Sequence, residues 1–460
     1  MIKMRNMGID LLRVFFQRAG ETRATSHFDQ DPDVCFRRDL PTTKSASRGI
    51  CLFTILIILF LFPIGGSAQV DNRLDANYVI QQGDLALRTG NSEKAYEHYT
   101  NAIQMDPAFA EAYMKRASLL MRTGRYNEAL QDLDQAYHYN PQSGYILDQR
   151  AKLRILMSDH KGAELDVVAA QQLAPYDELL QRERIDRWLD LGRPDRALED
   201  LDSLLIEHPN DTMLHLKKGF IHLQGENLDS ALATADRVLS LNDRSALAHD
   251  LRGLALMRSG RYQEAVAAYT AAITVWPGFS LAYYNRGVAY RALGMSDAAL
   301  HDMDMAIKLG QERTAFLAQR ALIRKETGDL PGAEEDYTSA LQLDPLAADL
   351  YYNRSFTRKH LGDRAGAMRD AEKALGLNDS DPMAWNQKGD LHLLFGEYLE
   401  AIEHYSRAIN LDPSAAEHLY DRGMAYLMNQ NLIQGCEDLR QSHELGLAAA
   451  TESMGWFCNF

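Results

Sequence analysis

Apolar and small residues follow one repeating pattern over most of this chain. Alanine recurs every 34 residues without a break, and other small residues recur with the same spacing. A fixed period of this length is typical of helix–turn–helix units stacked into a solenoid. The residues that set the period are Ala95, Ala129, Ala163, Ala197, Ala231, Ala265, Ala299, Ala333, Ala367 and Ala401, followed by Gly435.

The positions of the repeat predict where its helices begin and end. With the recurring alanine as position 20, eleven repeats fill residues 76–449. Position 8 is small in ten repeats and position 27 is alanine in eight, so two helices are expected to approach closely there. Position 15 is glycine in eight repeats, which predicts the end of a first helix. Position 32 is proline in seven, which predicts the turn between repeats.

This pattern is similar to that of the tetratricopeptide repeat family, and the resemblance covers residues 76–449. It implies an all-α, right-handed superhelical solenoid whose first helices line a concave groove. The last repeat departs from the pattern, because Leu447 replaces proline. Residues 450–460 are therefore expected to form a C-terminal capping helix, which a solenoid needs to cover its final apolar face.

Two charged columns of the repeat vary together. Every repeat with aspartate at position 23 has arginine at position 7, and Arg252 is the one arginine in that column without such an acid. The planar guanidinium suits a bidentate contact with a carboxylate. We therefore expect structural ion pairs between the two helices of a hairpin. They are Arg116 with Asp132, Arg150 with Asp166, Arg184 with Asp200, Arg286 with Asp302, Arg320 with Asp336, Arg354 with Asp370, and Arg422 with Asp438.

The family resemblance also implies that positions 2, 5, 9, 12 and 13 face the groove. Position 12 turns from apolar to basic at Arg291, Lys325 and Lys359, and Arg258 adjoins them at position 13. This predicts an apolar strip edged by cations, suited to a protein or peptide with apolar and acidic side chains. The alternative is that these cations are solvated or pair with acids such as Glu326 and Asp329. The apolar strip at position 9 comprises Phe220, Leu254, Val288, Leu322 and Phe356.

The front of the chain carries a different signal. Residues 50–62 are apolar except for Thr54, with Arg48 before them and Gly66 and Ala68 after them. This predicts a signal peptide over residues 50–68, cleaved before Gln69, and export to the periplasm or beyond. The alternative is a single-pass anchor that keeps residues 50–64 in the membrane, although the run is shorter than a spanning helix needs. Residues 1–49 show no convincing fold pattern and are expected to form a poorly structured leader, either a wrongly assigned start or a cytoplasmic tail.

Composition excludes several functions. The net charge is −15, which argues against nucleic-acid binding because phosphates require a basic surface. The four cysteines form no CxxC pair, and no catalytic or phosphate-binding motif is present, so no metal, cofactor or catalytic residue is expected. After cleavage only Cys436 and Cys458 remain; either they form a disulfide or, as we favour, they stay buried free thiols.

The sequence thus predicts an exported scaffold that binds a protein or peptide in its groove without catalysis. A first alternative is a membrane-anchored receptor or assembly factor, whose architecture would resemble that of mitochondrial import receptors. A second is an accessory subunit of an envelope or secretion enzyme system. No asparagine occupies position 9, which argues against the carboxylate clamp of the family's best-known groove.

Overall fold

The structure, a computed structural model, describes residues 66–310 and 313–458, and it describes side chains from Arg73 onward. Every regular element in these ranges is an α-helix. The described chain divides after Ile221 into two compact units. We call them the N-terminal unit (from residue 66 to Ile221) and the C-terminal unit (from His222), and each is described by itself.

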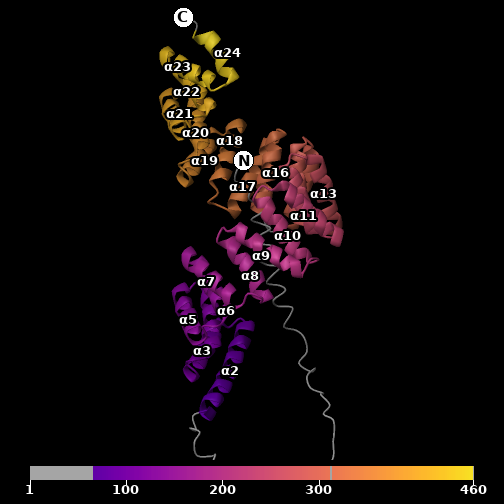
Figure 1. Cartoon of the computed structure of the whole chain (residues 1–460). Helices are drawn as coiled ribbons and strands as arrows, with labels where there is room; N and C mark the ends of the chain where they lie inside the picture. Colours follow the sequence, from indigo (N-terminus) through magenta and orange to yellow (C-terminus); the bar gives the residue numbers. More distant parts are fainter. Residues whose placement is uncertain (1–65, 311–312, 459–460) are drawn as a thin grey trace, which may run out of the picture. The chain divides into compact units, whose positions relative to one another are not determined.

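The helices of the N-terminal unit form consecutive antiparallel hairpins, α2 with α3 through α8 with α9 (Figure 1). The boundary between the units lies within α10. These helices are α2 (Gly66–Arg88), α3 (Ser92–Met105), α4 (Ala110–Arg122), α5 (Tyr126–Tyr139), α6 (Gly144–Leu156), α7 (His160–Leu173), α8 (Glu178–Asp190), α9 (Pro194–Glu207) and α10 (Thr212–Gln224).

The C-terminal unit continues with hairpins from α12 with α13 to α22 with α23, and α24 packs on α23 as the C-terminal cap. Its helices are α11 (Leu228–Leu241), α12 (Ala246–Arg258), α13 (Tyr262–Val275), α14 (Ser280–Ala292), α15 (Ser296–Leu309), α16 (Arg313–Glu326), α17 (Leu330–Leu343), α18 (Ala348–Leu361), α19 (Arg364–Leu377), α20 (Pro382–Phe395), α21 (Tyr398–Leu411), α22 (Ala416–Met428), α23 (Leu432–Glu444) and α24 (Ala448–Phe457).

Small residues allow the two helices of a hairpin to approach closely. The ten alanines at position 20 are all fully buried. At position 8, a β-carbon on Gly253 would lie 2.4 Å from the ring of Tyr269 at position 24. Glycine is therefore required there for the large ring on the second helix to pass beneath the first.

Each first helix is followed, within two residues, by a residue with a left-handed backbone conformation. All eleven residues at position 15 have positive φ, including Ser158, Glu226 and Gln430, which have side chains. Glycine adopts the left-handed conformation without a steric penalty, whereas residues with a side chain are destabilised by it. This explains why position 15 is glycine in eight repeats. The chain reverses here and starts the second helix.

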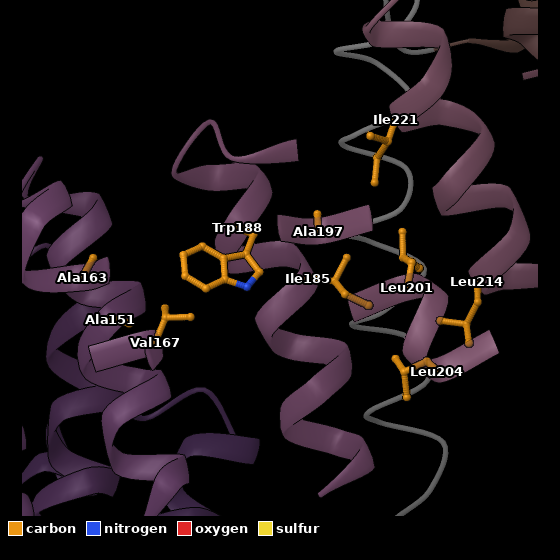
Figure 2. Close-up of a cluster of buried hydrophobic side chains, with 10 residues drawn as sticks. All are labelled: Ala151, Ala163, Val167, Ile185, Trp188, Ala197, Leu201, Leu204, Leu214 and Ile221. Carbon is orange, nitrogen blue, oxygen red and sulfur yellow. The ribbon is translucent and has the colours of Figure 1, made fainter. Parts of the chain in front are cut away.

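Repeat 4 departs from the pattern, because Ile185 occupies position 8 where every other repeat has a small residue. Figure 2 shows how the N-terminal unit accommodates it: the Trp188 indole points toward Ala163 and Val167, and Ile185 points toward the side of Leu201. The Trp188 Nε1–H donates to Asp200 at 3.1 Å. The core around Ile185 is thus packed in a way that leaves room for its larger side chain.

The expectation of two free thiols at the C-terminus is wrong. Cys436 on α23 and Cys458 directly after α24 form a disulfide, with their Cα atoms 5.6 Å apart. Both residues are partly exposed rather than buried. The bond holds the far end of the capping helix, which otherwise buries one apolar side chain, Ala450. The sequence could not establish this because the distance between the two Cα atoms depends on how the cap docks.

The N-terminal features predicted from the sequence lie outside the described residues. These are the leader at residues 1–49 and the apolar run at residues 50–62. Within the described ranges, no helix combines the length and the hydrophobicity that crossing a membrane requires.

Candidate functional site

The groove residues at position 9 lie on successive first helices of the C-terminal unit. Leu254, Val288, Leu322 and Phe356 come from α12, α14, α16 and α18, and each is half-buried. They form what we call the apolar strip. Phe220 differs, because it is 7% exposed and belongs to the N-terminal unit, so it is not part of this strip.

Two of the predicted groove cations are paired with acids of the chain. Arg291 makes a bidentate contact with Glu326 of the next first helix, with both N–O distances at 2.7 Å or less. The Lys359 ammonium lies 2.8 Å from the Asp390 carboxylate. The structure therefore does not present a row of three unpaired cations. Asp329, considered as another partner, instead caps α17 and approaches Arg324.

Lys325 is the position-12 cation without an ion pair among the described residues. Its Nζ lies 4.8 Å from the centre of the Phe356 ring, and the Lys359 Nζ lies 5.2 Å from the same ring. Burial lowers the pKa of Lys325, and Arg291 lowers it further against the opposing effect of Glu326. Together Lys325 and Phe356 place a poorly hydrated ammonium on an aromatic face within the apolar strip.

Arg258 contributes less to the groove than its position suggests. Its Nη1 donates to the backbone carbonyl of Leu223 at 2.6 Å, so the side chain joins two successive first helices. We therefore assign Arg258 to the framework of the groove.

The position-7 arginines contact the position-23 aspartates in all seven expected repeats. In each, Nε donates to one carboxylate oxygen and Nη2 to the other, at 2.6 to 2.9 Å. The aspartates are at most 8% exposed. These contacts are internal to the hairpins and leave the arginines no role at the groove surface.

Sequence reasoning missed a second partner for position 7, which lies at position 25 of the preceding repeat. Repeats without aspartate at position 23 use an acid there: Lys218 contacts Asp202 at 2.5 Å, and Arg252 contacts Asp236 at 3.5 Å. Lys388 lies 3.8 Å from Glu372 in the same way. Comparing position 25 of each repeat with position 7 of the next would have found these contacts.

A buried acid at position 5 was also missed. Asp250 on α12 is fully buried and accepts a hydrogen bond from the Asn285 side chain on α14 at 3.0 Å. Its second oxygen and the nearby Tyr269 hydroxyl have no partner in the described part of the chain. Burial raises the pKa of Asp250 to about 7, and the bond from Asn285 offsets part of that shift.

No group of three or more His, Cys, Asp or Glu residues in the described ranges is arranged to hold a metal ion. The site that the described residues do provide is a surface for contact, built from the apolar strip, Phe356 and Lys325.

Comparisons with solved structures find similar chains at low sequence identity and with TM-scores below 0.5. Yeast Tom70 is 14% identical, with a TM-score of 0.41 over 82% of this chain and 93% of its own. Cut9, solved with Hcn1 as an APC/C hetero-tetramer, is 13% identical, with a TM-score of 0.42 over 84% of this chain and 96% of its own. A tetratricopeptide repeat protein from Parabacteroides merdae is 19% identical, with a TM-score of 0.42 over 61% of this chain and 98% of its own.

Family models match directly along the repeats. A tetratricopeptide repeat model matches residues 80–144, 184–246 and 251–312, and a second TPR repeat model matches residues 389–430. A search of curated proteins found no match. The matched segments share the 34-residue period and the helical hairpins described above. The chain therefore belongs to the tetratricopeptide repeat family.

Proposed function

We propose that this protein is an exported scaffold that binds a segment of a partner protein in the groove of its C-terminal unit, without catalysis. Its fold is typical of proteins that mediate protein–protein interaction. The observation that carries the proposal is Lys325, a partly buried cation that lies on the Phe356 ring beside the apolar strip and forms no ion pair with any described residue. Apolar side chains of the partner would provide affinity, and a carboxylate would meet Lys325.

The charge of the protein supports an acidic anchor at that point. The chain carries a net charge of −15, so an acidic segment is repelled over most of the surface. Lys325 is a local exception, because Arg291 and Lys359 are already neutralised by Glu326 and Asp390. A carboxylate of the partner beside Lys325 would replace the contacts with water that the ammonium loses on burial. One charge contact among apolar contacts would fix the direction and register of the segment.

Export is the second part of the proposal, and its support is the sequence of residues 50–68. A basic flank, a short apolar run and small residues before Gln69 are the features of a cleaved signal peptide. If the run is retained, the same groove would serve an anchored receptor or assembly factor. Which of these holds depends on where the mature chain begins.

Photo-cross-linking in intact cells tests both parts. We expect a photoreactive phenylalanine analogue in place of Leu322 to capture the partner, and the same analogue in place of Leu399 to capture nothing. Leu399 is a suitable control because it is an exposed leucine on α21, a second helix of the same unit. Adducts from Leu399 and none from Leu322 would contradict the groove assignment. The mass of the recovered chain reports its N-terminus: Gln69 supports export, and retention of residues 50–62 contradicts cleavage.

A further inference from the structure

The first helix of the solenoid exposes an apolar stripe. Leu74, Tyr78 and Leu85 on α2 are 65%, 63% and 54% exposed. Their spacing of four and seven residues puts them on one face of the helix. Large apolar side chains exposed together on one helix mark an interaction surface more strongly than single exposed leucines do.

The positions of Tyr78 and Leu85 are buried in every later repeat, whereas residues equivalent to Leu74, such as Tyr176 and Leu346, are as exposed as Leu74 itself. Tyr78 and Leu85 occupy positions 3 and 10, where the ten following repeats are all less than 9% exposed. The covering group is the second helix of the preceding hairpin: Ala112 and Leu119 pack with Tyr99 and Ala102, for example. The stripe on α2 is therefore half of the interface that joins consecutive hairpins, and no described helix supplies the other half.

The exposed face of α2 also differs in charge from the corresponding faces of the later first helices. Position 7 holds an arginine or a lysine in all ten later repeats, but repeat 1 has the neutral Gln82. Most of those cations contact an acid or a hydroxyl on the preceding second helix, as Arg320 does with Asp304. The helix that covers α2 does not need to supply such a group, so it is not simply a missing hairpin of the same kind.

We propose that α2 of a second copy of this chain covers the stripe, so that the protein forms a twofold dimer through antiparallel α2 helices. The interface continues the inter-hairpin packing, with one amphipathic helix face laid on another. α2 spans 23 residues, of which 20 (residues 69–88) remain after cleavage before Gln69, and the other first helices of the described chain have 13 or 14, so α2 has the length to pair. Gln81 lies between Tyr78 and Leu85, and the stripe itself carries no charge. A twofold axis near Gln81 therefore sets no like charges against each other.

The test is the mass of the protein in solution, purified with the N-terminus it has in cells. We expect sedimentation equilibrium to give twice the chain mass at roughly 10 µM, and the double variant Tyr78→Glu/Leu85→Glu to weaken association by at least about tenfold. Trp456→Glu is the matched control, because Trp456 is 76% exposed on the cap at the other end of the chain. It should leave the dimer intact.

Three results would overturn the proposal. The first is a monomer at that concentration, which leaves the stripe to another partner or a membrane. The second is a dimer that persists in the double variant. The third is an open series of oligomers abolished by Trp456→Glu, which would mean head-to-tail association through the cap. Because Tyr78 and Leu85 are exposed within a single chain, the variants should keep the wild-type helix content in circular dichroism, and Tyr78→Ser provides a milder second variant.

Discussion

Replacing Asp336 with alanine should lower the free energy of unfolding by about 3 kcal/mol. Asp336 is 2% exposed and binds two arginines: Arg320 at 2.6 and 2.9 Å, and Arg324 at 2.9 Å. Without the carboxylate, two half-buried guanidinium groups of one hairpin would face each other with their shared counter-charge gone. The loss is large because one partner of a desolvated pair is removed and the other partners stay.

Asp304→Ala is the matched control for that change. Asp304 contacts the same guanidinium, at 2.6 Å from Arg320 Nη1, but its side chain is 59% exposed. Its loss should cost less than about 1 kcal/mol, because water replaces an exposed ion pair cheaply. Urea unfolding at neutral pH measures both variants. Equal costs for the two aspartates would contradict a structural role for the buried pairs.

Asp250→Asn should stabilise the protein at pH 8 by up to about 4 kcal/mol. The pKa of Asp250 is raised to about 7 by burial, against 3.8 as its ordinary value. Between those two values the folded protein binds more protons than the unfolded one, so stability falls as the pH rises from about 4 to about 7. Above that window the wild type holds an ionised carboxylate in a fully buried site.

The substitution removes that cost while keeping the local contacts. An asparagine oxygen can still accept from Asn285, and its amide can donate toward the Tyr269 hydroxyl, which has no partner in the described ranges. Urea midpoints at pH 5 and pH 8 measure the effect, with exposed Asp243→Asn as control. The variant should gain mainly at pH 8. A gain of the same size at both pH values would show that ionisation of Asp250 is not the cause.

The fold could be predicted from the sequence because the same pattern of residues occurs in eleven successive repeats. The alanine column predicted close helix contacts, and the glycine column predicted turns that the structure shows as left-handed residues. The covariation of positions 7 and 23 likewise identified which charges face each other within a hairpin. Residues that recur at a fixed spacing therefore predict the packing within each hairpin.

Groove contacts between successive first helices were harder to predict, because they join positions that vary. Arg291 with Glu326 and Lys359 with Asp390 each join one first helix to the next, and neither pair recurs along the chain. The burial of Asp250 depends on the side chains around it, so position 5 alone did not reveal it. The disulfide between Cys436 and Cys458 depended on the docking of α24, which occurs once.

The most direct test of the account is whether Lys325 selects acidic ligands in the groove. Random peptides displayed on phage should yield binders with an aspartate or glutamate beside apolar residues. Lys325→Glu should weaken those binders at least about tenfold in fluorescence anisotropy, which corresponds to about 1.4 kcal/mol. Lys373→Glu, the same charge change at an exposed site on α19, should leave them unaffected. Binders without an acid, or affinities unchanged by Lys325→Glu, would contradict the groove assignment.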